Sequence, residues 1–328
     1  EGLGYGFGTS APKGNYGDLR TRGWELTIDW HHTFGPVGVY ATANLSDYKT
    51  KVTEWDSNNL INNNYTGKEY GEIWGFETDR YFTSAADVAA SPSQTKLESG
   101  KFKYGPGDIK FVDQNGDGVI DWGKGTPEDH GDLIKIGNST PRYQYSFRFG
   151  GNWNGFDLDV YLQGVGKRDM WTQSAFVMPF MRGVDAIYTN QTSYVTAQQV
   201  ATENIDQNAK FPPLFGGGAG QGTISSSIIS GGRYNFYPQT KYLVNMAYLR
   251  LKNVTFGYTL PQKMARKAKI EKVRVYVAGT NLLDLINNNK GTGIDPEINT
   301  GVGSYANGVW GRTEPIYRTY SCGLQITF

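Results

Sequence analysis

The chain has little cysteine, little histidine and no long hydrophobic run. Cys322 is the one cysteine, so no disulfide forms within the chain and cysteine usage does not indicate a redox compartment. The longest apolar runs are a few residues, far short of the ~20 that a membrane-spanning helix needs. His31 and His32 point to opposite faces of a strand and His130 stands alone, which excludes a histidine-based zinc site.

An excess of charge of one sign is also missing. The 32 Lys and Arg residues balance 31 Asp and Glu residues, for a net charge of +1. Proteins that bind nucleic acids gain affinity from clustered, excess basic residues that contact phosphates. We therefore expect no nucleic-acid partner.

Glycine and aromatic residues, in contrast, are abundant. The chain contains 43 Gly, 22 Tyr, 16 Phe and 8 Trp residues, which is typical of a β-rich, turn-rich protein. Its end, Tyr320 to Phe328, alternates apolar and polar side chains. Because successive side chains of a strand point to opposite faces, the apolar set can meet lipid while the polar set meets a watery lumen.

Further segments of about ten residues share this alternation, and ten residues is the length that a tilted membrane strand requires. They lie near residues 24–31, 37–45, 142–149, 156–163, 248–260 and 273–278. In segment 248–260 the apolar residues switch from odd positions, such as Leu251, to even positions, such as Val254. This switch predicts a β-bulge near Lys252 or Asn253.

The connections between these segments alternate in length. The first, third and fifth are short, whereas the second, fourth and sixth are long and cover about residues 50–140, 166–247 and 283–314. Outer-membrane barrels typically alternate short periplasmic turns with long external loops. A soluble sheet does not require its connections to alternate in length in this way. We predict an all-β chain, residues 1–328 forming one domain, that is a segment of an antiparallel transmembrane β-barrel of about seven strands.

An odd number of strands leaves two open edges, which hydrocarbon does not tolerate. We therefore expect the chain to be an incomplete part of a larger barrel. The alternative is a small closed barrel with an eighth strand from Leu3, Tyr5 and Phe7, although glycine at the intervening positions would make that strand weak.

Ordered blocks of the sequence resemble the C-terminal part of SusC/RagA-like TonB-dependent outer-membrane transporters. The blocks are RTRGWELTIDW (20–30), FVDQNGDGVID (111–121), IGNSTPRYQYSF (136–147), FDLDVYLQG (156–164), YLRLKNVTFGYTLP (248–261), VRVYVAGTNLL (273–283) and GIDPE (293–297). They cover nearly all of the chain apart from the loop interiors.

This resemblance implies a barrel of about 22 strands around an N-terminal plug, which is absent from this chain. It implies a place in the cell outer membrane of a Gram-negative, Bacteroidetes-type bacterium, energy from TonB–ExbB–ExbD through the N-terminal region, and a SusD-like lipoprotein partner. The implied function is TonB-dependent nutrient uptake, with glycans or oligosaccharides as the expected substrate and peptides as the second choice. The alternative is a secreted or surface β-rich carbohydrate-binding module.

A calcium-like loop follows residue 112. Asp113, Asn115 and Asp117 occupy positions 1, 3 and 5 of an EF-hand-type loop, the Val119 carbonyl position 7 and Asp121 position 9. Position 12 is Lys124, so Asp132, or Glu128 or Asp129, would have to complete a structural Ca²⁺ shell of six to eight oxygens. The alternative is a double Asn-Gly and Asp-Gly turn without metal.

Tryptophans are expected in two settings. Trp55, Trp74, Trp122, Trp171 and Trp310 fall in the expected external loops, where their rings could stack on sugars, contact a partner or hold the loops together. Trp24, Trp30 and Trp153 fall near strand ends, as in the aromatic girdle of a barrel.

A carboxylate pair on one strand is the strongest candidate for catalysis. Asp157 and Asp159 share a strand face, but a polar lumen supplies charged neighbours by default, and Arg142 and Arg148 on the next strand could offset them. We predict that the chain is not an enzyme.

Overall fold

The computed structural model describes residues 17–56, 59–98, 102–171, 205–212, 235–267, 269–289, 292, 294–297 and 316–328. Leu3, Tyr5 and Phe7 of the alternative eighth strand lie outside these residues. Among the described residues no helix is long and apolar enough to cross a membrane.

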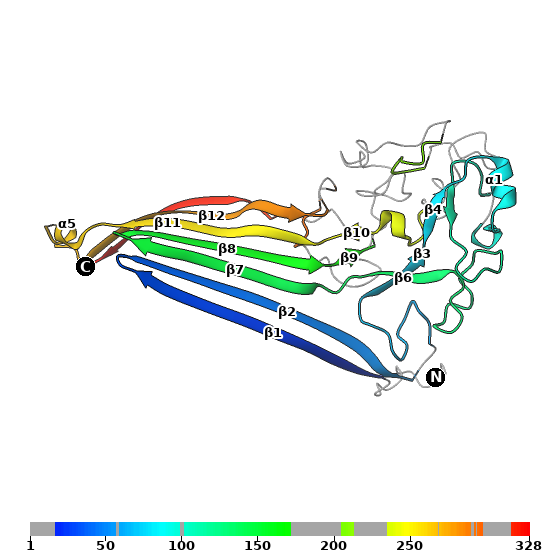
Figure 1. Ribbon diagram of the computed structural model, residues 1–328, viewed down its shortest axis with the longest axis horizontal. Coiled ribbons are helices and arrows are strands. Elements are labelled where there is room, and N and C mark those ends of the chain that lie inside the picture. Colours follow the sequence, from blue (N-terminus) through cyan, green and yellow to red (C-terminus); the bar gives the residue numbers. More distant parts are fainter. Residues whose placement is uncertain are drawn as a thin grey trace, which may run out of the picture.

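One antiparallel sheet of seven strands dominates the chain (Figure 1). In spatial order its strands are β1 (Gly17–Phe34), β2 (Val37–Trp55), β7 (Arg142–Trp153), β8 (Phe156–Lys167), β11 (Tyr248–Thr259), β12 (Lys272–Asn287) and β13 (Thr319–Thr327). These are the predicted segments, and each pairs with the next along the chain. Within the described residues, β1 and β13 are the two edges of an open sheet.

The predicted bulge is confirmed, whereas the predicted strand length is wrong for β1, β2 and the 16-residue β12, which extends to Asn287. The register of β11 shifts between Leu251 and Asn253 against both of its neighbours. β1 and β2 contain 18 and 19 residues, because their ladder of backbone hydrogen bonds continues well beyond the apolar alternation.

One face of the sheet is a continuous apolar surface. Register pairing aligns residues of all seven strands in rows across it. One row consists of Phe34, Val37, Trp153, Phe156, Tyr258, Val275 and Leu324. Another consists of Trp30, Ala41, Phe149, Val160, Val254, Gly279 and Tyr320. The large side chains in these rows are mostly exposed, as a lipid-facing surface requires.

Aromatic residues mark both ends of this apolar band. Phe34 and Trp153 lie in the row nearest the short turns. Trp24 and Tyr143 lie ten residues away on the same strands, toward the long connections. Ten residues span about 34 Å of strand, or about 25 Å of height at the tilt of membrane strands, which is the height of a barrel's apolar band. The positions of Trp24 and Trp153 therefore fit the predicted girdle, whereas Trp30 lies inside the band.

The connections confirm the predicted alternation of short turns and long loops. β1 joins β2 at Gly35-Pro36, β7 joins β8 at Asn154-Gly155, and β11 joins β12 through the short helix α5 (Gln262–Lys267), all at one end of the sheet (Figure 1). Both Asn154 and Gly155 have positive φ, at 48° and 88°, which is the geometry of a tight hairpin turn.

The long connections lie at the opposite end and contain the hydrophobic core. Their elements are β3 (Glu72–Phe76), β4 (Thr78–Tyr81), α1 (Ala85–Ala90), η2 (Thr95–Leu97), β5 (Ile109–Phe111), β6 (Leu133–Asn138), β9 (Asp169–Met170), η3 (Thr240–Tyr242) and β10 (Val244–Asn245). Their largest fully buried side chains are Phe76, Tyr81, Phe82, Phe102, Phe111, Phe211 and Phe236. We call the described residues within 56–141, 168–247 and 288–297 the loop region. This region is therefore held together like a globular domain.

Candidate functional site

The face of the sheet opposite the apolar surface carries paired charges. Asp159 on β8 accepts hydrogen bonds from the Tyr40 hydroxyl on β2 and from Nε of Arg148 on β7, the latter at 2.8 Å. Asp157, two residues earlier, accepts from Nε of Arg274 on β12 at 2.9 Å. The expected offset by Arg148 is confirmed. The expected offset by Arg142 is wrong, because its guanidinium instead pairs with Asp47 on β2.

Glycines on this face allow side chains to cross a strand. Tyr40, Gly150 and Asp159 lie side by side on β2, β7 and β8, so the tyrosine reaches over the glycine to the carboxylate. A Cβ atom at Gly150 would lie 2.5 Å from the Tyr40 hydroxyl oxygen. Gly257 similarly lies under the pair formed by Asp157 and Arg274.

Hydroxyl and amide groups continue this network along the first three strands of the sheet. The Thr42 hydroxyl donates to Asp29 at 2.7 Å, and the Thr27 hydroxyl donates to Asn44 at 2.9 Å. The Asn44 amide in turn donates to Ser146 at 3.1 Å. With Asp157 and Asp159 paired to cations and the Asn44 amide hydrogen-bonded, the described side chains of this face form a hydrophilic wall.

Buried hydrogen bonds join the first two long connections. Asp108 is 1% exposed and accepts a hydrogen bond from the Asn235 amide nitrogen at 2.7 Å and from the Gly105 backbone at 2.9 Å. The Asn235 oxygen accepts from the Ile109 backbone at 2.9 Å. Burial raises the pKa of the Asp108 carboxyl to about 7, against the opposing effect of these hydrogen bonds.

The third long connection is fixed to the sheet by Arg250 on β11. Its Nη1 atom lies 3.1 Å from Asp295 and 2.6 Å from Glu297, and its Nε atom lies 2.6 Å from Asp284. Asp295 and Glu297 belong to the GIDPE block. Sequence reasoning found this block but missed its ion pairs, because the partner lies more than 40 residues away.

The candidate loop tryptophans lie in different settings. Trp55 is the last residue of β2 and therefore not a loop residue, because the β1–β2 ladder extends to it. Trp74 donates to Glu72 at 2.8 Å and lies beneath the Lys135 ammonium. Trp171 is 7% exposed in the hydrophobic core, so its ring is covered by protein and unavailable to a sugar.

Two further tryptophans complete the set. Trp122 is 37% exposed and packs edge-on against Tyr237. Trp310 lies outside the described residues. The placement of Trp74 and Trp171 fits the role of holding the loops together, and Trp122 is the most exposed of the described loop tryptophans.

The calcium-like loop forms a series of side-chain turns. Asp113 accepts hydrogen bonds from the Gly116 and Gly118 backbones at 2.7 and 2.9 Å. Asn115 accepts from the Asp117 backbone at 2.9 Å, and Asp117 accepts from Val119 at 2.8 Å. This is the geometry of the double-turn alternative.

Asp132 reaches back across this loop, as the calcium hypothesis requires of a closing residue. It is buried and accepts from the Gln114 and Asp121 backbones, both at 2.8 Å. Burial raises the pKa of its carboxyl. Among the described residues no group of three His, Cys, Asp or Glu side chains is arranged to hold a metal, so Ca²⁺ binding stays a prediction.

Known proteins resemble the chain over nearly its whole length. Two curated relatives from Formosa agariphila, "TonB-dependent receptor P26" and "TonB-dependent receptor P3", are each 24% identical to it over 96% and 98% of the chain. The predicted resemblance to TonB-dependent receptors is confirmed. The chain spans about 30% of the length of these relatives. No family model matches it.

Solved structures show the same fold. The structure of the RagAB peptide importer in its open-open state aligns with 100% of this chain, with a TM-score of 0.64 and 20% sequence identity. The alignment covers 31% of the importer's chain. The closed-closed state of the same importer matches 99% of this chain with a TM-score of 0.62. The seven-stranded sheet is therefore a segment of the wall of an antiparallel transmembrane β-barrel, as predicted. Its relatives are receptors and transporters, not enzymes.

Proposed function

We propose that this chain supplies barrel wall and external loops to a TonB-dependent importer in the outer membrane of a Gram-negative, Bacteroidetes-type bacterium. The observation that carries the proposal is the division of one sheet into an exposed apolar face and a charge-paired polar face. Lipid on one side and water on the other account for this division. Energy would come from TonB–ExbB–ExbD, acting on a plug that closes the complete barrel.

The partner is proposed to be a SusD-like lipoprotein that covers the loop region. The packing of its described residues supports this role, because the buried aromatic core and the Asp108–Asn235 and Arg250 contacts join segments that are far apart in the sequence. A preorganised loop surface loses little conformational entropy when a partner docks on it.

Glycans or oligosaccharides are the proposed substrate class, through the resemblance to SusC-like transporters. Peptides are the second candidate, and the specific observation that favours them is that the structural neighbours are a peptide importer. The partly open ring of Trp122 supports either class, since it can stack on a sugar or on an apolar side chain.

Uptake by cells tests the proposal. Deletion of the gene should abolish accumulation of a labelled oligosaccharide or of a labelled peptide, and deletion of tonB should have the same effect. The one ligand class whose uptake is lost identifies the substrate. Normal uptake of both classes without the gene, or recovery of the protein in the soluble fraction without detergent, would instead favour a soluble carbohydrate-binding module.

A further inference from the structure

Four cationic side chains lie on the apolar face of β1 and β2, between Trp24 and the long connections. The register pairs Arg22 with Lys49 and Arg20 with Lys51, directly after the pair formed by Trp24 and Asp47. Paired residues and residues two apart share a face, so the cations lie on the face that carries Trp24 and Leu26. We call Arg20, Arg22, Lys49 and Lys51 the basic patch.

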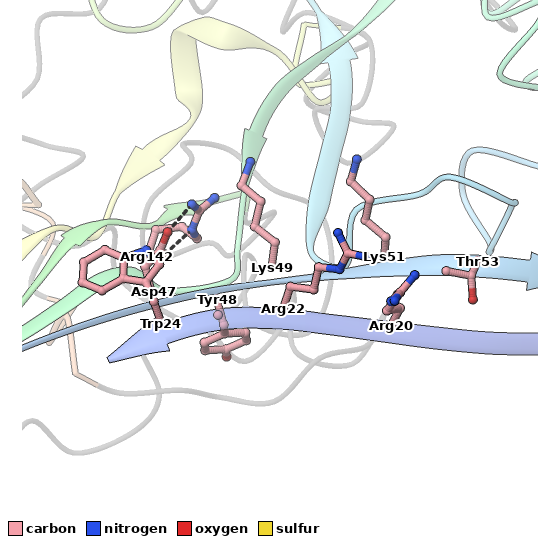
Figure 2. A pocket seen from close by; sticks show the side chains of 10 residues that line it. Arg20, Arg22, Trp24, Asp47, Tyr48, Lys49, Lys51, Thr53 and Arg142 are labelled. Atoms are coloured by element: carbon pink, nitrogen blue, oxygen red, sulfur yellow. Dashed lines mark hydrogen bonds and ion pairs between the residues drawn. The ribbon is translucent and has the colours of Figure 1, made fainter. Parts of the chain in front are cut away.

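The basic patch lines a hollow. Its volume is about 560 Å³, and Gly23, Trp24, Asp47, Tyr48, Thr53 and Arg142 complete the lining. Figure 2 shows the four basic side chains along the two strands and the ion pair between Arg142 and Asp47 beside Trp24. The hollow thus has a cationic part and, at its lower end, an aromatic ring.

Little protein charge compensates this patch. Within the described part of the chain, no carboxylate lies within ion-pairing distance of Arg20, Arg22 or Lys51, and Lys49 has one distant partner, Glu69 at 3.5 Å. Of the neighbouring carboxylates, Asp47 is already paired with Arg142, and Asp18 and Glu54 pair with each other in register beyond the patch. Glu69 lies opposite Lys51 in an isolated bridge and is shared between Lys49 and Arg142. Elsewhere on the sheet, the cations Arg142, Arg148 and Arg274 are matched by Asp47, Asp159 and Asp157.

The depth of the patch indicates what compensates it. Trp24 marks the edge of the apolar band, and the two basic pairs lie about 7 and 14 Å further along the strands. Side chains at that depth, on the outward face, lie among lipid headgroups. Arginine and lysine there attract anionic headgroups, and the guanidinium fork matches a phosphate.

We propose that the basic patch binds the phosphorylated headgroup of a lipid in the leaflet on the loop side, with its acyl chains against Trp24 and Leu26. The site rests on the proposed insertion of the barrel in a membrane but not on transport. A phosphate group would bridge the two basic pairs, and the open hollow gives room for a headgroup larger than a single phosphate.

Binding of a fluorescent bisphosphorylated lipid A to the purified full-length protein, in micelles that also contain phosphatidylcholine, tests this proposal. The variant R20Q/R22Q/K49Q/K51Q removes the patch. The matched control, K263Q/R266Q/K267Q/K269Q, removes the same charge from the turn at the opposite end of the sheet. Each cation is worth about fivefold in affinity at a headgroup surface, so the patch variant should bind at least a hundredfold more weakly and the control unchanged.

Chemically matched lipids separate the phosphate from the rest of the ligand. Dephosphorylated lipid A should bind the wild type as weakly as the patch variant binds the intact lipid, and free inorganic phosphate at millimolar concentration should not displace the lipid. Equal binding of the dephosphorylated lipid, equal loss in both variants, or full displacement by free phosphate would overturn the proposal. Heat-modifiable migration on gels verifies that each variant is folded. Because lipid binding is measured without transport, a failure of the proposed uptake function would leave this test of the basic patch unaffected.

Discussion

The Tyr40 hydroxyl on β2 donates a hydrogen bond to Asp159 on β8, although β7 lies between these two strands. The bond is feasible because Gly150 occupies the intervening position of β7 and has no side chain. A glycine normally weakens a strand, and here a neighbouring aromatic ring covers it. The relationship joins three strands through one side chain and fixes their register on the polar face.

Substitution of Gly150 should therefore destabilise the barrel more than loss of the hydrogen bond itself. In Gly150→Ala the new methyl group would meet the Tyr40 ring and the Leu158 carbonyl oxygen, at 2.1 Å from the latter, so the strands must shift. We expect a loss of about 2 kcal/mol for Gly150→Ala and about 1 kcal/mol for Tyr40→Phe. Urea unfolding of the protein in detergent, followed by tryptophan fluorescence, measures both. Wild-type stability of Gly150→Ala would contradict this account.

Removal of Arg250 should be far more damaging than removal of Arg148. The Arg250 side chain is 6% exposed among three carboxylates, whereas the Arg148 side chain is 59% exposed beside one. Arg250→Ala leaves the buried Asp295 without a cationic partner, at a cost of about 3–5 kcal/mol, while Arg148→Ala should cost at most about 1 kcal/mol. Protease digestion of the loop region in the folded protein distinguishes them. Equal protease resistance of the two variants would show that the buried network contributes nothing specific.

The strands were predictable because their signal is local. Alternation with a period of two, the change in apolar positions near Lys252 or Asn253 and short connections such as Gly35-Pro36 are all read within a few residues. The length of β1 and β2 was not predictable in this way. Beyond Trp24 both faces are polar, so the alternation that marks a strand disappears while the backbone ladder continues.

The hydrophobic core of the loop region could not be predicted from local sequence patterns. Phe82, Phe102 and Phe236 lie in irregular segments without periodicity, so nothing local shows that they share a core. The contact between Asp108 and Asn235 joins residues 127 positions apart, and the basic patch depends on register pairing across two strands. Such features require the three-dimensional arrangement, and they are the ones that define the candidate sites.

Calcium should bind the loop after residue 112 if its turns rearrange around the ion. The side-chain oxygens of Asp113, Asn115 and Asp117 now accept backbone hydrogen bonds, and Asp132 closes the loop. Isothermal titration should give one Ca²⁺ site that Asp113→Ala abolishes and that Lys124→Gln, at the missing ligand position, leaves in place. An absence of heat with the wild type would establish the metal-free double turn.

The loop region should lose stability as the pH rises, and Asp108 should be responsible. Its pKa in the folded state is raised to about 7, above that of an exposed carboxyl near 4, so between these values the folded state holds a proton that the unfolded state has lost. The free energy of unfolding is therefore unaffected below about pH 4, falls as the pH rises from 4 to 7, and is lower by a few kcal/mol above pH 7.

Hydrogen exchange measures this effect locally. After correction for intrinsic rates, backbone amides of residues 105–111 should exchange faster at pH 8 than at pH 5.5 in the wild type. Asp108→Asn should flatten this dependence, although its amide replaces one acceptor oxygen and lowers protection at all pH values. Asp87→Asn is the control, because the Arg80 guanidinium holds the pKa of Asp87 well below its usual range and no titration occurs in this window. A pH dependence that persists in Asp108→Asn would assign the effect to another group, because the neutral side chain cannot release a proton there.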